Sequence, residues 1–83
     1  MKAVEIYTTR TCPYCVAAKG LLTKKGVAFT DIDVGGDPAL RAKMTQRAGR
    51  TSVPQIFIAG SHIGGCDDLH ALERSGKLDA MLA

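Results

Sequence analysis

The sequence has few cysteines, little net charge and no long hydrophobic run. Three cysteines are too few, and an odd number, for the disulfide framework of a small secreted protein. A net charge of +3 from dispersed basic residues does not indicate binding to nucleic acid or to a membrane surface. No stretch is long enough to span a membrane, and the first residues run directly into a predicted strand instead of a signal peptide. These absences predict a cytoplasmic protein.

The length and composition predict one globular domain over residues 1–83, because 46% of the residues are hydrophobic. Strands are expected at residues 3–8, 27–34, 55–58 and 62–63, and helices at residues 13–25, 39–48, 67–74 and, as a short last turn, 78–82. A right-handed crossover makes the first two strands parallel, and the short connection at residues 59–61 makes the last two antiparallel. The expected fold is an α/β sandwich, with a four-stranded mixed sheet flanked by three main helices.

The most informative motif is Cys-Pro-Tyr-Cys at residues 12–15, between a predicted strand and a predicted helix. Cys12 is expected at the start of the helix and Cys15 in its first turn, while Pro13 fits the first helical position. Free backbone N–H groups and the helix dipole favour negative charge there, which lowers the pKa of a thiol. Because the thiolate is the form that attacks disulfides, the motif predicts a redox-active dithiol.

Two further segments accompany this motif: Ser-Val-Pro at residues 52–54 and Gly-Gly-Cys-Asp-Asp at residues 64–68. Together the three segments resemble the signatures of the dithiol glutaredoxins, in the order and spacing of that family. The resemblance runs from about residue 4 to residue 82 and is strongest to the short bacterial members. It implies a thioredoxin-like fold and a glutathione-dependent thiol–disulfide oxidoreductase, which reduces protein disulfides and protein–glutathione mixed disulfides.

The resemblance gives the two cysteines of the motif different roles. Cys12 would be the nucleophile, and Cys15 would resolve a protein mixed disulfide by attacking Cys12. On glutathione adducts a second glutathione could resolve the bond instead. Glutathione would be a co-substrate, regenerated by glutathione reductase, and no tightly bound cofactor or metal is expected. The expected partners are glutathione and disulfide-containing or glutathionylated client proteins, and the protein is expected to be a monomer.

The resemblance also implies where the cysteinyl unit of glutathione binds. Pro54 would be a cis proline that faces the redox cysteine, so that the backbone of Val53 pairs with an extended peptide. Ser52 stands where the family usually has threonine and keeps the hydroxyl group. Tyr14 would form a wall of the same site.

The γ-glutamyl group would lie at the start of the third long helix. Gly65 allows close approach of the backbone, and the N–H groups of the helix terminus, at Cys66 and Asp67, suit the carboxylate. The Asp68 side chain would pair with the ammonium group. Capping of the helix by Asp67 is an alternative explanation of the acidic residues.

The glycine carboxylate of glutathione needs a cation, but Thr9 stands where the family commonly has lysine. Arg10, one position later, and Arg41 on the second predicted helix are the candidates, although either could be a solvated surface charge. Cys66 is expected to be a small, partly buried apolar residue, with a lowered pKa and glutathionylation as the alternative. Exposed, solvated positions are predicted for Lys24, Lys25, Arg47, Arg50 and His62.

Two other interpretations remain open at this point. A thioredoxin-like hydrogen donor served directly by a flavin reductase would share the fold, but such chains usually lack the segment found at residues 64–68. A metal-binding module would hold zinc or a bridging iron–sulfur cluster through Cys12 and Cys15. The chain has no second CxxC for a four-ligand zinc site, and Pro13 stiffens the loop that would hold a cluster.

Overall fold

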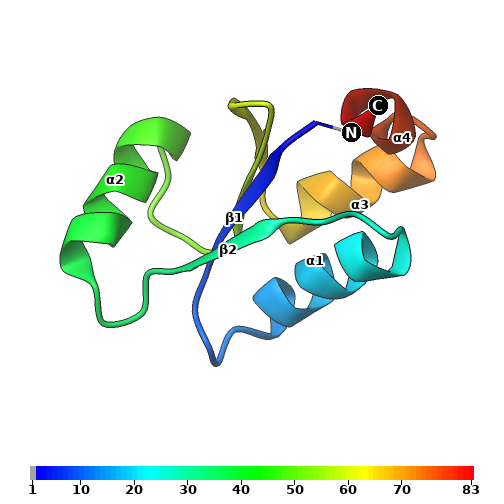
Figure 1. Cartoon of the computed structure of the whole chain (residues 1–83). Coiled ribbons are helices and arrows are strands. Elements are labelled where there is room, and N and C mark those ends of the chain that lie inside the picture. The colour runs from blue at the N-terminus through cyan, green and yellow to red at the C-terminus, as the bar shows by residue number, and fades with distance from the viewer. Residues whose placement is uncertain (1) are drawn as a thin grey trace.

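A computed structural model describes residues 2–83, which form four strands and four helices. In chain order the elements are β1 (Val4–Thr8), α1 (Pro13–Lys24), β2 (Thr30–Asp33), α2 (Pro38–Ala48), β3 (Gln55–Ile58), β4 (Ser61–Gly64), α3 (Cys66–Arg74) and α4 (Leu78–Leu82). The strands form a mixed sheet in the order β2-β1-β3-β4 (Figure 1). β1 is parallel to β2 and antiparallel to β3, which is antiparallel to β4. The predicted α/β fold with a four-stranded mixed sheet is confirmed.

Alternating side chains of the central strands divide the core between the two faces of the sheet. α1 and α3 cover one face, and α2 covers the other (Figure 1). The first cluster contains Val4, Ile6, Ala18, Leu22, Val27, Ile56, Ile58, Cys66, Leu69, Leu78 and Leu82, and the second contains Tyr7, Val34, Met44 and Phe57. Both central strands are therefore covered on both sides, which gives the site a rigid support.

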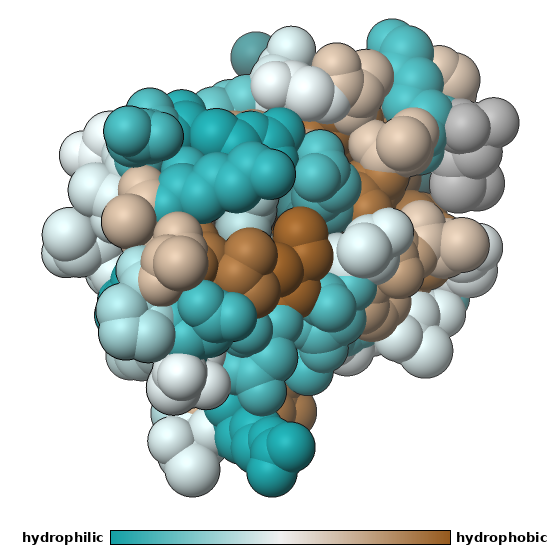
Figure 2. Space-filling view, turned by 60° about the vertical axis from the view of Figure 1, so that its left-hand side comes forward, coloured by the Kyte–Doolittle hydropathy of each residue, from teal (hydrophilic) through white to brown (hydrophobic). Residues whose placement is uncertain are grey.

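The side on which α2 lies comes forward in Figure 2. Hydrophilic residues cover most of the left-hand part of this view, and hydrophobic residues lie near its centre and to the right. This agrees with the burial pattern of α2, in which Met44 is the fully buried residue. Within residues 2–83 no helix is both long and apolar enough to cross a membrane.

β2 is shorter than the sequence predicts, because the residues before it complete the end of α1. Gly26 has a φ of 72°, and its N–H bonds to the carbonyl oxygen of Thr23 at 3.0 Å. The N–H of Val27 bonds to the carbonyl oxygen of Leu22 at 2.9 Å. These two bonds form a Schellman motif. The motif holds Val27 against the helix, so the strand begins at Thr30 instead of at Val27.

A two-residue turn joins β3 to β4. Ile58 pairs with Ser61, so Ala59 and Gly60 alone form the connection. Both have positive φ, 52° and 81°, as a type I′ turn requires. β4 consequently includes Ser61 and Gly64 in addition to the two residues predicted.

α3 begins at Cys66, and Gly65 is its N-cap residue. The N–H of Gly65 donates to Oδ2 of Asp68 at 2.9 Å. In a capping box the acid at the third helical position accepts this bond from the N-cap residue. Capping by Asp67, the alternative explanation from the sequence, is wrong, because the N-cap lies two residues earlier and Asp68 makes the bond.

Two basic residues predicted to be solvated are partly buried instead. The Lys25 side chain is 13% exposed, and its Nζ lies 2.7 Å from Oε1 of Glu73 and 2.7 Å from Oδ1 of Asp79. The Arg47 guanidinium lies 4.0 Å from the centre of the Phe57 ring. The partners come from other elements of the fold, so the positions of Lys25 and Arg47 along the chain gave no sign of them.

Candidate functional site

The dithiol motif lies at the junction between β1 and α1. Cys12 is the N-cap residue of α1, and Pro13 occupies the first helical turn without needing a hydrogen-bond acceptor. The backbone N–H of Cys15 donates to Sγ of Cys12 at 3.3 Å. Both cysteines are free thiols, with Cys15 buried and Cys12 partly exposed. The arrangement therefore presents one thiol to solvent and keeps its neighbour inside.

The pKa of the Cys12 thiol lies below its ordinary value. Partial burial acts to raise this pKa, but hydrogen bonds to the sulfur from the Cys15 thiol and from the backbone N–H groups of Cys15 and Tyr14 outweigh it. These donors belong to the first turn of α1, where the helix leaves N–H groups without internal partners. The helix terminus thus stabilises the thiolate, which is the nucleophilic form.

The pKa of the Cys15 thiol moves in the opposite direction. Burial raises it to about 11, and the hydrogen bond to Cys12 and the charge of Cys12 add to the effect. A hydrogen bond from the backbone of Thr9 and the charge of Lys19 oppose the rise. At neutral pH Cys15 is therefore a thiol, whereas Cys12 is the cysteine more readily ionised.

The segment before β3 faces the reactive sulfur. The peptide bond between Val53 and Pro54 is cis. Sγ of Cys12 lies 3.7 Å from the carbonyl oxygen of Val53. The backbone of Val53 is therefore within reach of a group bound at Cys12.

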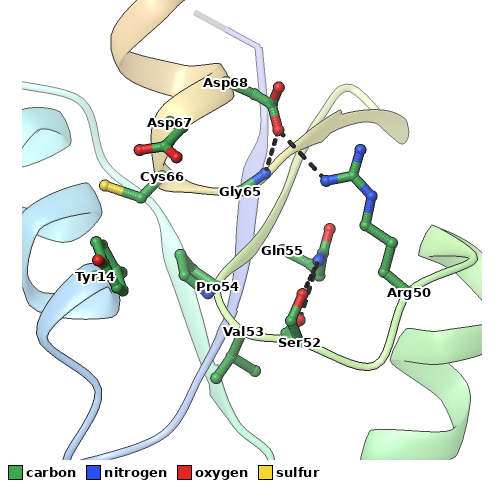
Figure 3. A pocket seen from close by; sticks show the side chains of 10 residues that line it. All are labelled: Tyr14, Arg50, Ser52, Val53, Pro54, Gln55, Gly65, Cys66, Asp67 and Asp68. Atoms are coloured by element: carbon green, nitrogen blue, oxygen red, sulfur yellow. Dashed lines mark hydrogen bonds and ion pairs between the residues drawn. The ribbon is translucent and has the colours of Figure 1, made fainter.

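A cavity of about 190 Å³ opens beside this segment (Figure 3). It is lined by Tyr14, Arg50, Ser52, Val53, Pro54, Gln55, Gly65, Cys66, Asp67 and Asp68. The lining comes from the start of α1, the segment before β3 and the start of α3, which are far apart in the sequence. Eight of these residues were predicted as site residues from the sequence, and the fold brings them around one cavity.

Asp68 is held at the edge of the cavity by two contacts. Its Oδ2 accepts the N–H of Gly65 at 2.9 Å and lies 3.5 Å from Nη1 of Arg50 (Figure 3). Gly64 lies next to this carboxylate and has a φ of 124°, and a Cβ atom at position 64 would come within 2.2 Å of Oδ2 of Asp68. The Asp68 carboxylate therefore depends on glycine at position 64, while its other oxygen, Oδ1, is available to a ligand.

The structure places Arg10 and Arg41 outside this cavity. Arg10 is 90% exposed, and its Nε lies 3.5 Å from Oδ2 of Asp33 beside a separate hollow. Nη2 of Arg41 donates to the carbonyl oxygen of Thr51 at 2.9 Å. Arg41 thus supports the segment that leads to the cavity, and Arg10 lies beside a different hollow, together with Asp33.

Two residues of the lining were missed from the sequence. Arg50 was predicted to be a solvated charge, and it is exposed, but it also lines the cavity with its Nη1 3.5 Å from Oδ2 of Asp68. Gln55 was regarded only as part of a strand, but its side chain is buried behind the segment that it follows. A polar residue inside an apolar strand, directly after Pro54, is the signal that could have identified Gln55.

Cys66 is buried, with 8% of its surface exposed. Burial raises the pKa of its thiol, and the charges of Asp67 and Cys12 add to the rise. Its Sγ lies 3.3 Å from Nδ1 of His70 on the next turn of α3. The expectation of a small buried residue is confirmed, and the alternative of a lowered pKa is wrong. Within residues 2–83 no group of three His, Cys, Asp or Glu side chains is placed to hold a metal ion.

Comparisons with known proteins agree with this geometry. Residues 4–63 match the Glutaredoxin family model. The Glutaredoxin of Pseudomonas aeruginosa is 60% identical over 83 residues, which cover 100% of this chain and 99% of that protein. The solution structure of Glutaredoxin from Brucella melitensis superimposes with a TM-score of 0.88 at 56% identity, over 99% of this chain and 89% of that one. A crystal structure of a buckwheat glutaredoxin–glutathione complex superimposes with a TM-score of 0.89 at 33% identity, over 98% of this chain and 76% of that one.

Proposed function

The chain belongs to the glutaredoxin family, and on that premise we propose that it is a glutathione-dependent thiol–disulfide oxidoreductase. Its substrates are protein disulfides and mixed disulfides between proteins and glutathione. The observation that carries the proposal is the opposite behaviour of the two thiols. Cys12 is partly exposed beside Val53 and has a lowered pKa, whereas the pKa of the buried Cys15 is raised to about 11. A dithiol of this kind attacks with one sulfur and keeps the other protonated until it is needed.

The first step is an attack by the Cys12 thiolate on a substrate disulfide. A bond forms between Sγ of Cys12 and one substrate sulfur, and the substrate disulfide breaks. The other substrate sulfur leaves as a thiolate and takes a proton from solvent. On a protein–glutathione mixed disulfide this step releases the reduced protein and leaves glutathione attached to Cys12.

The second step depends on what is attached to Cys12. A glutathione adduct is attacked by a second glutathione, which leaves as glutathione disulfide and restores the Cys12 thiolate. A protein adduct is attacked by Cys15 after it loses its proton, and the client leaves reduced while a bond forms between Cys12 and Cys15. Two glutathione molecules then reduce that bond and leave as glutathione disulfide, the substrate of glutathione reductase.

The lining of the cavity suits a glutathionyl group attached to Cys12. The Val53 backbone lies 3.7 Å from the Cys12 sulfur, which is where the cysteinyl unit must be. The γ-glutamyl ammonium would pair with Asp68, and its carboxylate would meet the N–H groups at the start of α3 near Asp67. The similar buckwheat structure, a complex with glutathione, supports this occupant.

The glycine end of glutathione would extend away from α3. Arg41 and Arg10 remain the proposed cations for its carboxylate, and either would have to move from the partner that it has in the free protein. The protein is further proposed to act as a single domain in the cytoplasm. The cavity would bind the glutathionyl group and would not determine which client proteins are reduced.

The proposal is tested by trapping the glutathione adduct. Cys15→Ser is incubated with glutathione disulfide, and the product is analysed by mass spectrometry after proteolysis. One glutathione attached to Cys12 is the expected result, and Cys12→Ser treated in the same way should carry none at position 15. Unmodified Cys12 would contradict the proposal and direct attention to a flavin reductase as the electron donor.

A further inference from the structure

Gln55 is a buried polar residue, 1% exposed, whose side chain lies behind the segment that faces Cys12. Its Nε2 donates to the carbonyl oxygen of Ser52 at 3.0 Å and lies 3.3 Å from Oγ of the same residue (Figure 3). Its Oε1 lies 2.7 Å from Nε2 of His62. Both ends of the amide are therefore in use, which fixes the side chain in one orientation.

His62 completes this arrangement from the neighbouring strand. The amide oxygen of Gln55 can only accept, so Nε2 of His62 must carry the proton of the bond. Both the neutral Nε2–H form of the ring and the imidazolium meet this requirement. The His62 ring also packs against Phe57, with ring centres 5.1 Å apart. His62 is thus held by β3 in a position from which it orients Gln55.

The carbonyl group that Gln55 binds belongs to the same peptide unit as the N–H of Val53. A peptide unit is planar, and in the trans form its C=O and N–H point in opposite directions. A carbonyl of Ser52 turned inward to Gln55 therefore requires the N–H of Val53 to point outward. That N–H is the donor that would pair with the backbone of an extended peptide bound beside Cys12.

We propose that Gln55, oriented by His62, is a positioning residue that holds the Val53 N–H toward the cysteinyl backbone of the glutathionyl substrate. This inference rests on the proposed function, because it assigns a role at the same site. Gln55 does not touch the substrate sulfur. It acts through the Ser52–Val53 peptide, and its loss would let that peptide rotate and weaken substrate binding.

The attack itself should be unaffected by the loss of Gln55. The hydrogen bonds that lower the pKa of Cys12 come from Cys15 and Tyr14 on α1, none of them from the segment before β3. The inference therefore requires a rise in KM for a glutathione mixed disulfide, with kcat and the pH dependence of Cys12 alkylation unchanged. If Gln55 had only a structural role, its loss would lower the stability of the protein without raising KM at a constant kcat.

The test uses Gln55→Met, which keeps the length of the side chain and removes both hydrogen bonds. His62→Phe keeps the ring packed on Phe57 and removes only the donor, and His62→Gln restores a donor. Gln46→Met, on the exposed face of α2, is the matched control. The KM and kcat for a glutathione mixed disulfide, the pH dependence of Cys12 alkylation and the amide signal of Val53 in NMR spectra are measured for each.

Gln55→Met is expected to raise KM about fivefold, the effect of one neutral hydrogen bond, and His62→Phe somewhat less. The Val53 amide signal should shift in both variants, while His62→Gln and Gln46→Met stay close to the wild type. An unchanged KM and an unchanged Val53 signal in folded His62→Phe and Gln55→Met would overturn the inference. If the wild type itself shows no turnover, the proposed function fails, and the Val53 signal still decides whether Gln55 orients that peptide.

Discussion

Sγ of Cys12 lies 3.3 Å from the backbone nitrogen of Cys15, and the two thiols differ in burial and in the direction of their pKa shifts. The same helix terminus produces both effects. It donates hydrogen bonds to the exposed sulfur, and it places the second sulfur three residues further along, inside the core. The proposed division of labour, with Cys12 as nucleophile and Cys15 as resolving thiol, rests on this geometry.

The pH dependence of alkylation should separate the two cysteines. Because the pKa of Cys12 is lowered, its thiolate persists below pH 9, and the alkylation rate should fall only as the pH drops through that lowered value. Cys15, whose pKa is raised to about 11, should stay unreactive at neutral pH. Reaction with iodoacetamide, followed by mass spectrometry of the peptides, measures both. Faster labelling of Cys15 than of Cys12 at neutral pH would contradict the assignment of roles.

Asp68→Asn should raise KM for a glutathione mixed disulfide about tenfold, the effect of a charge-assisted hydrogen bond. The asparagine keeps an oxygen that can accept the N–H of Gly65, so α3 should remain intact. Asp67→Asn is the matched control and should raise KM less, because the proposed contact at that position is made by the backbone. With a substrate whose γ-glutamyl amine is acetylated, Asp68→Asn and the wild type should have the same KM. A difference that persists with the acetylated substrate would show that Asp68 does not bind the ammonium group.

Arg47→Ala should lower the free energy of unfolding by about 1–2 kcal/mol. The guanidinium stacks on Phe57 at 4.0 Å, and its Nη2 lies 3.1 Å from Oε1 of Glu5, so the change removes a stack and an ion pair. Arg74→Ala, at an exposed position on α3, should change stability by no more than about 0.5 kcal/mol. Urea denaturation of the three proteins measures the difference. Equal stability of the two variants would show that neither the stack nor the ion pair contributes.

Two glycines should respond to alanine in opposite directions. Gly20 is exposed within α1 and has open space around it, so Gly20→Ala should stabilise the protein by about 0.5–1 kcal/mol. Gly64→Ala would place Cβ within 2.2 Å of the Asp68 carboxylate at a φ of 124°, and should destabilise by about 2 kcal/mol or more. Thermal unfolding checks both changes. A stable Gly64→Ala variant with an unchanged KM would mean that Asp68 does not depend on this glycine.

The order of the elements could be predicted because each has a local signal. Pro13 marks the start of α1, and the pair Ala59 and Gly60 marks the turn between β3 and β4. The start of β2 could not be predicted, because an apolar, β-branched residue such as Val27 suits a strand and also suits the residue that packs against the end of a helix. Its N–H bonds to Leu22 through a Schellman motif, and neighbouring residues do not reveal that choice.

The candidate site was predictable where its residues form continuous motifs. The cavity brings Tyr14, Pro54 and Asp68 together from three such segments. Arg50 and Gln55 were missed because their importance comes from partners on other elements, Asp68 in one case and His62 in the other. Long-range pairing of this kind depends on the sheet order, which only the folded structure supplies.

The most direct test of the account is the glutathione-dependent reduction of a small mixed disulfide, coupled to NADPH oxidation through glutathione reductase. The wild type is measured beside Cys12→Ser and Cys15→Ser. We expect an active wild type, no activity in Cys12→Ser, and retained activity in Cys15→Ser, because a second glutathione can resolve the adduct. Inactivity of the wild type, or activity that survives Cys12→Ser, would contradict the central claim that the Cys12 thiolate carries glutathione-dependent disulfide exchange.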